Sequence, residues 1–352
     1  MINQIEIRNF RCFKHLKLQS LKRFNFIVGE SGTGKTALLE AMFLAGAGNP
    51  EVWFRLRRWR GLGEGPISLG VRETYEALFR DIFYGFDQKT GANIRILDSD
   101  LGKRELEIYY KKSNVYTLPL KSEQEPQAFA IDPIQFKWDF GNEVVNSQVE
   151  FKDGALRITG NAKVYPIFLV SPRTFSGRDN AQNFSTLSRM NRSKPVLAAV
   201  KSIFKDVDDI SLELIAGEPQ IFVSLPTLSE KLPLGDLSGG LSKYVEIVLA
   251  ILTNPGGAIL IDEIENGFYY RNMPDLLKNI VALCEEHHVQ LFATTHSYEF
   301  LQVMSGAMSA AKKAAEAFSL LRLETRDGHP PEVRVIPGDS YEAAINEHFE
   351  IR

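Results

Sequence analysis

A glycine-rich loop between a strand and a helix is the feature that most constrains the fold of this chain. Residues 29–36 read Gly-Glu-Ser-Gly-Thr-Gly-Lys-Thr. The apolar run 24–28 predicts a strand leading into this loop, and apolar residues at helical spacing predict a helix over 36–45. A strand, a loop of this composition and a helix together make a P-loop, which surrounds a phosphate. The sequence therefore predicts an α/β fold with a phosphate site, and the alternative is a chance glycine-rich turn.

The residue types of this loop match its expected chemistry. Glycines at 29, 32 and 34 let the backbone wrap around a phosphate, and the N-terminus of the following helix adds positive potential. Lys35 would reach the β- and γ-phosphates, and Thr36 would ligate Mg²⁺. The expected ATP-binding residues of the loop are Gly29, Glu30, Ser31, Gly32, Thr33, Gly34, Lys35 and Thr36.

Two further motifs follow along the chain. Leu-Ser-Gly-Gly at 237–240 precedes an expected helix over 241–252, so Ser238 and the amides of Gly239 and Gly240 would present a positive helix end to an anion. The alternative is an ordinary serine N-cap. The apolar run 258–261 ends in Asp262 and Glu263, a Walker B pattern. Asp262 would hold Mg²⁺ through water and Glu263 would polarise the attacking water, unless both are solvated turn residues.

In their order, the P-loop, Leu-Ser-Gly-Gly, the acidic pair and His296 resemble the motifs of ABC-type ATPases. The resemblance implies that His296 contacts the γ-phosphate and senses hydrolysis, whereas a lone histidine is usually structural. It also implies that Ser238 acts on the ATP of another subunit, because a signature cannot reach the P-loop of its own chain. Two heads are therefore expected to pair head-to-tail, as a homodimer or a higher even-numbered oligomer.

The expected fold class is α/β, a P-loop ABC-type ATPase head with an inserted β-rich region and a helical signature lobe. Short alternating runs between turn residues predict the β-rich insertion. Apolar spacing and length predict the other elements. The expected boundaries are a core lobe over 1–170 and 245–352, the β-rich insertion over 92–160, a signature lobe over 171–244 with a small αβ segment at 210–225, and helices over 71–83, 273–286 and 306–318.

Composition narrows the classes of function. A formal charge of −3 gives no global reason to expect nucleic-acid binding, so such binding would need a local patch. With only Cys12 and Cys284, neither a disulfide framework nor a cysteine-based zinc site is expected. The N-terminus lacks the features of a signal peptide, and no apolar run approaches the ~20 residues that span a bilayer. We expect a soluble, cytoplasmic protein with no membrane partner.

Three segments resemble one branch of these ATPases. Ile5-Glu-Ile-Arg-Asn-Phe-Arg-Cys-Phe is similar to the opening strand of SMC/RecF/OLD-like ATPases, and residues 261–267 and 292–297 resemble the OLD-type ATPases and their stand-alone AAA relatives. The resemblance covers residues 1–48 and 160–352. It implies that Arg11 lies near the nucleotide, where a surface arginine is the alternative.

The chain also departs from that branch. Nuclease-bearing OLD proteins continue into a TOPRIM domain, whereas 56 residues follow His296 here, so we expect any nuclease to be a separate polypeptide. Residues 267–269 read Gly-Phe-Tyr where relatives have Gly-Leu-His, so no role passes to a histidine there. A Q-loop glutamine cannot be assigned between Gln148 and Gln182.

The densest basic run contains Arg55, Arg57, Arg58 and Arg60, with Trp53 and Trp59 beside them. It could follow a phosphate backbone and stack on bases, as nucleic-acid-binding surfaces do. Docking of a partner or a solvated helix face are the alternatives.

These observations favour a slow, partner-regulated ATPase that acts as a switch or clamp. The resemblance implies that it binds ATP and Mg²⁺ across a dimer and controls a separately encoded effector, a nuclease or toxin, in a prokaryotic anti-phage defence or toxin-type system. The alternative is a RecF-like DNA-repair ATPase that binds DNA directly. A transporter's nucleotide-binding subunit and a non-catalytic ATP-binding scaffold are the remaining candidates.

Overall fold

The chain forms two compact units in the computed structural model. Unit 1 holds residues 1–21, 31–165 and 323–333, and unit 2 holds residues 22–30, 166–322 and 334–352. The structure describes residues 1–62, 72–112, 132–152, 155–171, 177–309, 316–325 and 329–337. The expected division into a core lobe (1–170 and 245–352) and a signature lobe (171–244) has boundaries that differ from those of the two units, and it stays a prediction.

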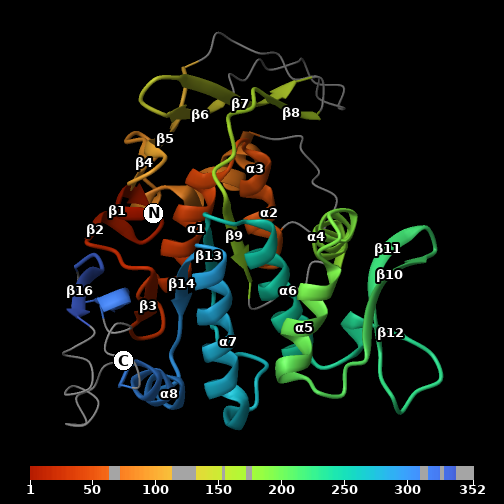
Figure 1. Ribbon diagram of the computed structural model, residues 1–352. Coiled ribbons are helices and arrows are strands. Elements are labelled where there is room, and N and C mark those ends of the chain that lie inside the picture. Colours follow the sequence, from red (N-terminus) through yellow and green to blue (C-terminus); the bar gives the residue numbers. More distant parts are fainter. Residues whose placement is uncertain are drawn as a thin grey trace. The chain divides into compact units, whose positions relative to one another are not determined.

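Unit 1 is built on a seven-stranded antiparallel sheet in the order β2-β1-β4-β5-β6-β7-β8 (Figure 1). Alternation sets its register: Ile5 and Ile7 on β1 pair with Ile96 and Ile94 on β4, and all four are fully buried. The β-rich region expected over 92–160 thus joins β1 in one sheet. The strands are β1 (Ile2–Phe10), β2 (Phe13–Gln19), β4 (Ala92–Asp98), β5 (Gly102–Tyr110), β6 (Ile134–Asp139), β7 (Val144–Lys152) and β8 (Ala155–Thr159).

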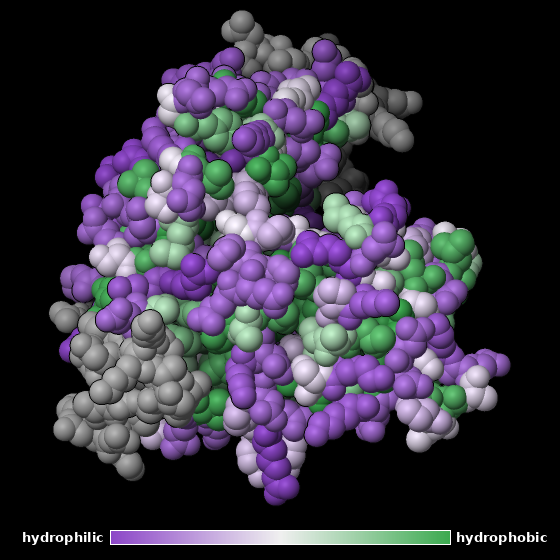
Figure 2. Space-filling view, in the orientation of Figure 1, coloured by the Kyte–Doolittle hydropathy of each residue, from purple (hydrophilic) through white to green (hydrophobic). Residues whose placement is uncertain are grey.

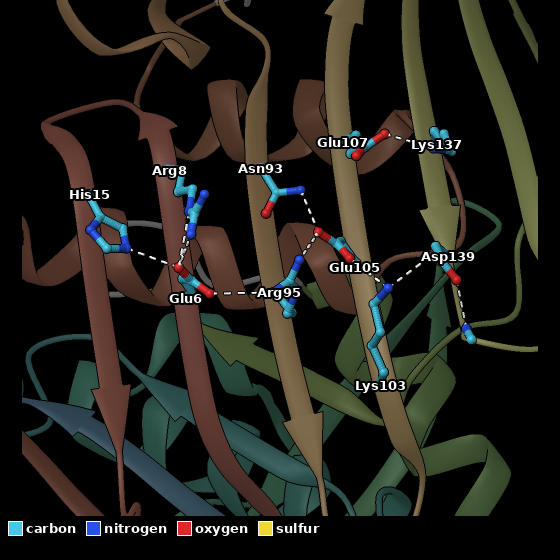
Figure 3. Close-up of polar contacts among 11 residues, drawn as sticks. Glu6, Arg8, His15, Asn93, Arg95, Lys103, Glu105, Glu107, Lys137 and Asp139 are labelled. Carbon is cyan, nitrogen blue, oxygen red and sulfur yellow. Dashed lines mark hydrogen bonds and ion pairs between the residues drawn. The ribbon is translucent and has the colours of Figure 1, made fainter.

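The opposite face of this sheet carries a ladder of paired charges (Figure 3). Glu6 on β1 lies 3.0 Å from His15 Nε2 and 3.6 Å from an Arg95 nitrogen. Glu105 on β5 pairs with Arg95 at 2.8 Å and with Lys103 at 2.7 Å. Burial alone would raise the pKa of Glu105, but these ion pairs hold it at about 2. The glutamates of this charged face are therefore neutralised by arginine and lysine side chains of the same sheet.

Three helices of unit 1 are α1 (Lys35–Gly46), α2 (Glu51–Trp59) and α3 (Arg72–Phe79), followed by the short 3₁₀ turns η1 (Arg80–Ile82) and η2 (Tyr84–Phe86). α1 packs on β1, β4 and β5 and is buried from Ala37 onward. Arg104 of β5 holds its C-terminal end, donating to the carbonyl oxygens of Ala45 at 2.6 Å and Ala47 at 2.8 Å. The helix that follows the P-loop is thus fixed at its far end.

Unit 2 is built on a six-stranded sheet in the order β16-β15-β3-β14-β13-β9, in which β15, β3, β14, β13 and β9 run parallel (Figure 1). β9 and β13 are continuous apolar runs, as is typical of strands in a parallel sheet that helices cover on its faces. The strands are β3 (Phe24–Val28), β9 (Ile167–Val170), β13 (Ala258–Ile261), β14 (Gln290–Thr294), β15 (Phe318–Glu324) and β16 (Glu332–Pro337).

α6 is buried from Gly240 to Leu252 and contacts α4, α5 and α7, whereas α8 packs on α7. The hydrophobic residues of α6 form one core with β3, β13 and β14. Among the described residues, no helix has the length and apolar character needed to cross a membrane. The helices are α4 (Gly177–Arg189), α5 (Ser193–Ile203), α6 (Gly239–Thr253), α7 (Met273–Glu286) and α8 (Tyr298–Ser309), with 3₁₀ turns η3 (Leu234–Asp236) and η4 (Tyr270–Asn272).

The αβ segment expected at 210–225 is wrong, because this region is a β-hairpin. β10 (Asp209–Ile215) and β11 (Glu218–Ser224) pair antiparallel, and β12 (Leu232–Pro233) adds a third strand. The turn residues Ala216 and Gly217 take φ of 49° and 85°, the conformation that two-residue hairpin turns require. Leu214 and Ile215 beside the turn are exposed, and Figure 2 shows hydrophobic side chains at this end of the hairpin.

The other expected elements are present, with shifted ends. The helix predicted over 71–83 is α3, and that over 241–252 is α6. β2 and β6 are strands that the sequence analysis does not predict. Residues 310–315 of the helix expected over 306–318 fall outside the described residues, α8 ends at Ser309, and Phe318 begins β15 instead.

Candidate active site

The carboxyl ends of three parallel strands meet at one edge of the sheet in unit 2. Thr294 of β14 pairs with Ile27 of β3, and Ile261 of β13 pairs with Ala293. Parallel strands in this register end at the same level. Gly29, Asp262 and His296, which follow these strands, therefore start from the same edge, where open α/β sheets bind their ligands.

The loop 29–34 leaves β3 in conformations that need glycine. Gly29, Gly32 and Gly34 adopt φ of 142°, 85° and 98°. α1 begins directly after Gly34, with no side-chain cap and no acidic residue in its first turn. Its N-terminal backbone N–H groups are thus not neutralised by a carboxylate of that turn, which suits an anion.

Packing also requires glycine at position 34, within unit 1. A Cβ atom there would lie 2.5 Å from Cys12 Sγ and 2.8 Å from Phe13 Cζ. The hairpin between β1 and β2 therefore presses on the backbone of the expected phosphate loop. Any side chain at this position would strain both φ and packing.

A hydroxyl ties the two expected catalytic acids to the neighbouring strand. Thr294 Oγ1 donates to Asp262 Oδ1 at 2.6 Å and accepts the backbone N–H of Glu263 at 2.7 Å. Asp262 and Thr294 are both buried. A single threonine thus fixes the carboxylate of one acid and the backbone of the next.

Glu263 has a left-handed backbone, with φ of 49°. This conformation costs a non-glycine residue about 1–3 kcal/mol, and residues held this way cluster at functional sites. The amide of Asn266 donates to Glu263 Oε2, which aims the carboxylate. The turn formed by Asp262 and Glu263 is called the catalytic turn below.

His296 is anchored by a second acid that the sequence analysis does not single out. Its backbone N–H donates to Glu265 Oε1 at 3.0 Å, and its Nδ1 lies 3.4 Å from the same oxygen. Glu265 is buried, whereas the His296 side chain is 56% exposed. Glu265 therefore contacts the imidazole at Nδ1, and more than half of the His296 side chain stays exposed; its sensing role stays a prediction.

Ser238 caps α6, since its hydroxyl accepts the backbone N–H of Leu241 at 3.2 Å. The N-cap alternative is thus correct for its side chain, and it does not exclude an anion-facing role for this helix end. The next residues pack closely on the segment after the catalytic turn: a Cβ on Gly240 would lie 2.4 Å from the carbonyl oxygen of Gly267. The glycines of the motif therefore bring this helix end against residue 267.

Lys243, one turn into α6, is buried with 8% of its surface exposed. Its Nζ donates to the carbonyl oxygens of Glu263 and, at 3.4 Å, of Asp262. Burial lowers the pKa of Lys243 to about 8, although the nearby carboxylates of Glu265, Asp262, Glu263 and Glu246 favour its charged form.

Arg11 lies in unit 1 in a buried ion cluster. Its Nε is 2.9 Å from Glu40 Oε2 and its Nη1 is 3.6 Å from Asp81, while the guanidinium stacks on Trp53 at 5.0 Å. The side chain is 8% exposed, so the surface-arginine alternative is wrong. Glu40 belongs to α1, which places Arg11 against the helix of the P-loop; a contact with nucleotide stays a prediction.

Two arginines of the basic run form ion pairs within unit 1. Arg57 pairs with Asp81 at 2.9 Å, and Arg60 makes two hydrogen bonds of 2.7 Å to Glu40. Trp53 is fully buried and cannot stack on bases, which corrects that part of the nucleic-acid prediction. Arg58 is the exposed arginine of the run.

The Q-loop candidates have other positions. Gln148 lies in β7, where its amide donates to Glu150 at 2.9 Å. Gln182 lies on an exposed side of α4. Gln148 belongs to unit 1 and Gln182 to unit 2, and a Q-loop role for either residue stays a prediction.

Sequence reasoning missed Thr294, Glu265, Asn266 and Lys243. Two signals were available: a lysine inside an otherwise apolar helical stretch, and a threonine pair directly before His296. Neither signal indicates which residue the side chain would contact, because each contact joins different secondary-structure elements.

The oxygens at this edge fit a hard divalent cation. Mg²⁺ prefers carboxylate and hydroxyl oxygens and keeps several waters. Asp262 supplies such a carboxylate, and Glu265 Oε2 is buried with no hydrogen-bond partner among the described residues. Within the same residues, no group of three or more His, Cys, Asp or Glu side chains could hold a metal ion.

Known proteins resemble this chain along most of its length. Residues 24–302 match the family described as "AAA domain, putative AbiEii toxin, Type IV TA system". A Helicobacter pylori protein named "ATP/GTP phosphatase" is 25% identical over 380 residues, covering 99% of this chain and 98% of that protein. The "DNA replication and repair protein RecF" of Actinobacillus pleuropneumoniae is 49% identical over 47 residues, 13% of each chain.

A solved structure shares the fold. It is an Smc head domain with an extended coiled coil, bound to the C-terminal domain of ScpA and derived from Pyrococcus furiosus. It covers 98% of both chains with a TM-score of 0.50 and 13% identity. The fold is thus that of a P-loop ABC-type ATPase head.

Proposed function

We propose, from the premise that this chain belongs to the AAA-domain family whose description names the AbiEii toxin, that its ATPase works as a head-to-tail dimeric switch. ATP would close two copies and hydrolysis would release them, so that a separate effector is held in one state. The observation that carries the proposal is the catalytic turn. Glu263 is held in a left-handed conformation by Thr294 at the edge from which loop 29–34 starts.

The residues would divide the chemistry as follows. The backbone of loop 29–34 and Lys35 would hold the phosphates, and Glu263 would accept a proton from the attacking water. His296, oriented by Glu265, would donate to the γ-phosphate. Mg²⁺, held by Thr36 and through water by Asp262, would supply charge neutralisation of the phosphates when bound.

The dimer follows from the position of the signature. Ser238, Gly239 and Gly240 begin α6 with their N–H groups directed out of the helix end, which favours an anion. In the resemblance to ABC-type ATPases this anion is the ATP of the second copy. Each nucleotide would then be bound by the P-loop of one copy and the signature of the other.

The effector is proposed to be a separately encoded nuclease or toxin, in a prokaryotic anti-phage or toxin-type system. The family description supports this proposal. The RecF-like alternative is supported by the 47-residue match and by exposed Arg58. It predicts ATP-dependent DNA binding with a steep salt dependence.

Light scattering of the Glu263→Gln protein tests the proposal. With ATP and Mg²⁺ its mass should double, because ATP binds but is not hydrolysed; with ADP it should not. An unchanged mass with bound ATP, both alone and with the product of a neighbouring gene, would contradict the dimeric switch. The Lys35→Ala protein, which should not hold ATP, is the matched control.

A further inference from the structure

Two charged residues, Lys243 and Glu246, lie inside the apolar helix α6. They are 8% and 5% exposed. A buried ammonium group is retained only where it is paired and hydrogen-bonded, since burial otherwise disfavours it strongly. The position of Lys243 therefore calls for a function beyond packing.

The hydrogen bonds of Lys243 go to the backbone of the catalytic turn. Its Nζ donates to the carbonyl oxygens of Glu263 and Asp262 and not to a solvent-exposed group. Carbonyl contacts fix the path of the backbone, and the side chain of Glu263 follows that path. The other supports of Glu263 come from Thr294 of β14 and from Asn266, which follows the catalytic turn. Lys243 adds a support from the signature helix.

A second contact joins the same two segments. Gly240 and Gly267 pack backbone to backbone, because a Cβ on Gly267 would lie 3.2 Å from the Gly240 nitrogen. The beginning of α6 thus contacts residues 262–267 at two places. Lys243 contacts the catalytic turn, and Gly240 contacts Gly267. These two contacts therefore link the beginning of α6 to the segment that contains Glu263.

We propose that Lys243 is a positioning residue that couples the signature end of α6 to the Glu263 of its own chain. The inference rests on the proposed dimer, in which that helix end meets the ATP of the second copy. When the second copy carries ATP, α6 would be drawn into place and Glu263 would reach its working position. Each copy would then hydrolyse its ATP efficiently only when both sites are filled.

ATP hydrolysis by Lys243→Met, Lys243→Arg and Ser242→Ala tests this coupling. Wild type should depend on ATP with a Hill coefficient above one. Lys243→Met should lose this cooperativity and about tenfold or more in kcat, with little change in KM, since small misplacements of a catalytic group are costly. Lys243→Arg keeps a charged donor and should recover part of both. Ser242 is the neighbour of Lys243 in α6, and its hydroxyl donates a buried hydrogen bond to the Leu234 carbonyl, away from the catalytic turn. Ser242→Ala removes this hydrogen bond and should behave as wild type.

The outcomes separate the two proposals. In the Glu263→Gln background, Lys243→Met should still double its mass with ATP, which shows that folding and dimerisation survive. Wild-type kcat and cooperativity in a folded Lys243→Met protein would overturn the coupling and leave the dimer standing. If Lys243→Met does not fold, equal kcat and cooperativity in Lys243→Arg and Lys243→Gln at unchanged thermal stability would overturn it. Loss of the ATP-dependent dimer in Glu263→Gln alone would instead remove the proposed function.

Discussion

Two clusters of acids in this protein are neutralised in different ways. On the charged face of unit 1, Glu6 and Glu105 are each surrounded by several cationic side chains (Figure 3). At the edge of the parallel sheet in unit 2, Asp262 and Glu263 are held by a hydroxyl, an amide and backbone groups, with Lys243 as a nearby buried cation.

This difference agrees with a structural role for the glutamates of the charged face and with the proposed catalytic role of Glu263. A carboxylate whose charge is balanced by neighbours has no need of a ligand, and its role is to hold strands together. The carboxylate of Glu263 instead accepts a hydrogen bond from the neutral amide of Asn266, as expected for a group that meets a proton. Each prediction below changes one side of this comparison.

The largest effect is expected for Glu263→Gln. The amide keeps the shape of the side chain but accepts no proton, so kcat should fall by about 10²–10⁴-fold. ATP affinity should change little. Single-turnover hydrolysis measures the rate, and Glu105→Gln serves as the control from the charged face, with an unchanged rate. A Glu263→Gln protein that hydrolyses ATP at the wild-type rate would show that the base lies elsewhere.

Thr294→Val should come next. It removes the hydroxyl that serves both Asp262 and the Glu263 backbone, so kcat should fall by roughly tenfold to a hundredfold. The buried groups left without a partner should also cost about 1–3 kcal/mol of unfolding free energy. Thr294→Ser keeps the hydroxyl and should restore the rate. Equal rates in the two variants would exclude the hydroxyl as the cause.

Glu105→Gln should affect stability in a pH-dependent way. The folded pKa of Glu105 is about 2, below its ordinary value. Its ion pairs therefore stabilise the fold above about pH 5, and the contribution is lost as pH falls toward 2. The thermal midpoints of wild type and variant should differ at neutral pH and converge in acid. A difference that stays constant down to pH 2 would contradict the ion-pair account.

The smallest effect is expected for Arg58→Glu. Arg58 is exposed, so its reversal should change stability by no more than about 0.5 kcal/mol. Arg57→Glu should destabilise more, because it places a carboxylate against Asp81. DNA binding by wild type that Arg58→Glu abolishes would favour the RecF-like alternative over the switch.

The parts of the site that could be predicted are those encoded by consecutive residues. The loop 29–36, the motif at 237–240 and the acids after 258–261 each lie on the element expected for them. The positive φ of residue 34 and its close approach to Cys12 both require glycine. The motif alone predicts this glycine, without knowledge of the φ angle or of the contact.

The supports of the site could not be predicted because they join distant residues. Thr294 reaches Asp262 across 32 positions, and Lys243 reaches Glu263 across 20. Arg60 likewise finds Glu40 in another helix, so a run that resembles a basic patch is partly an internal ion cluster. The hairpin at 209–224 was missed because Ala216 takes a positive φ that alanine rarely adopts.

Mixing two inactive variants tests the central claim most directly. Lys35→Ala destroys the P-loop and keeps the signature, whereas Ser238→Arg destroys the signature and keeps the P-loop. Each protein alone should be inactive. An equimolar mixture should regain a measurable ATPase rate, below about half of the wild-type rate, because only a mixed pair has an intact composite site, one of its two, and the other site holds no ATP. No recovery in mixed dimers confirmed by mass, or full activity of Ser238→Arg alone, would contradict a site shared between two copies.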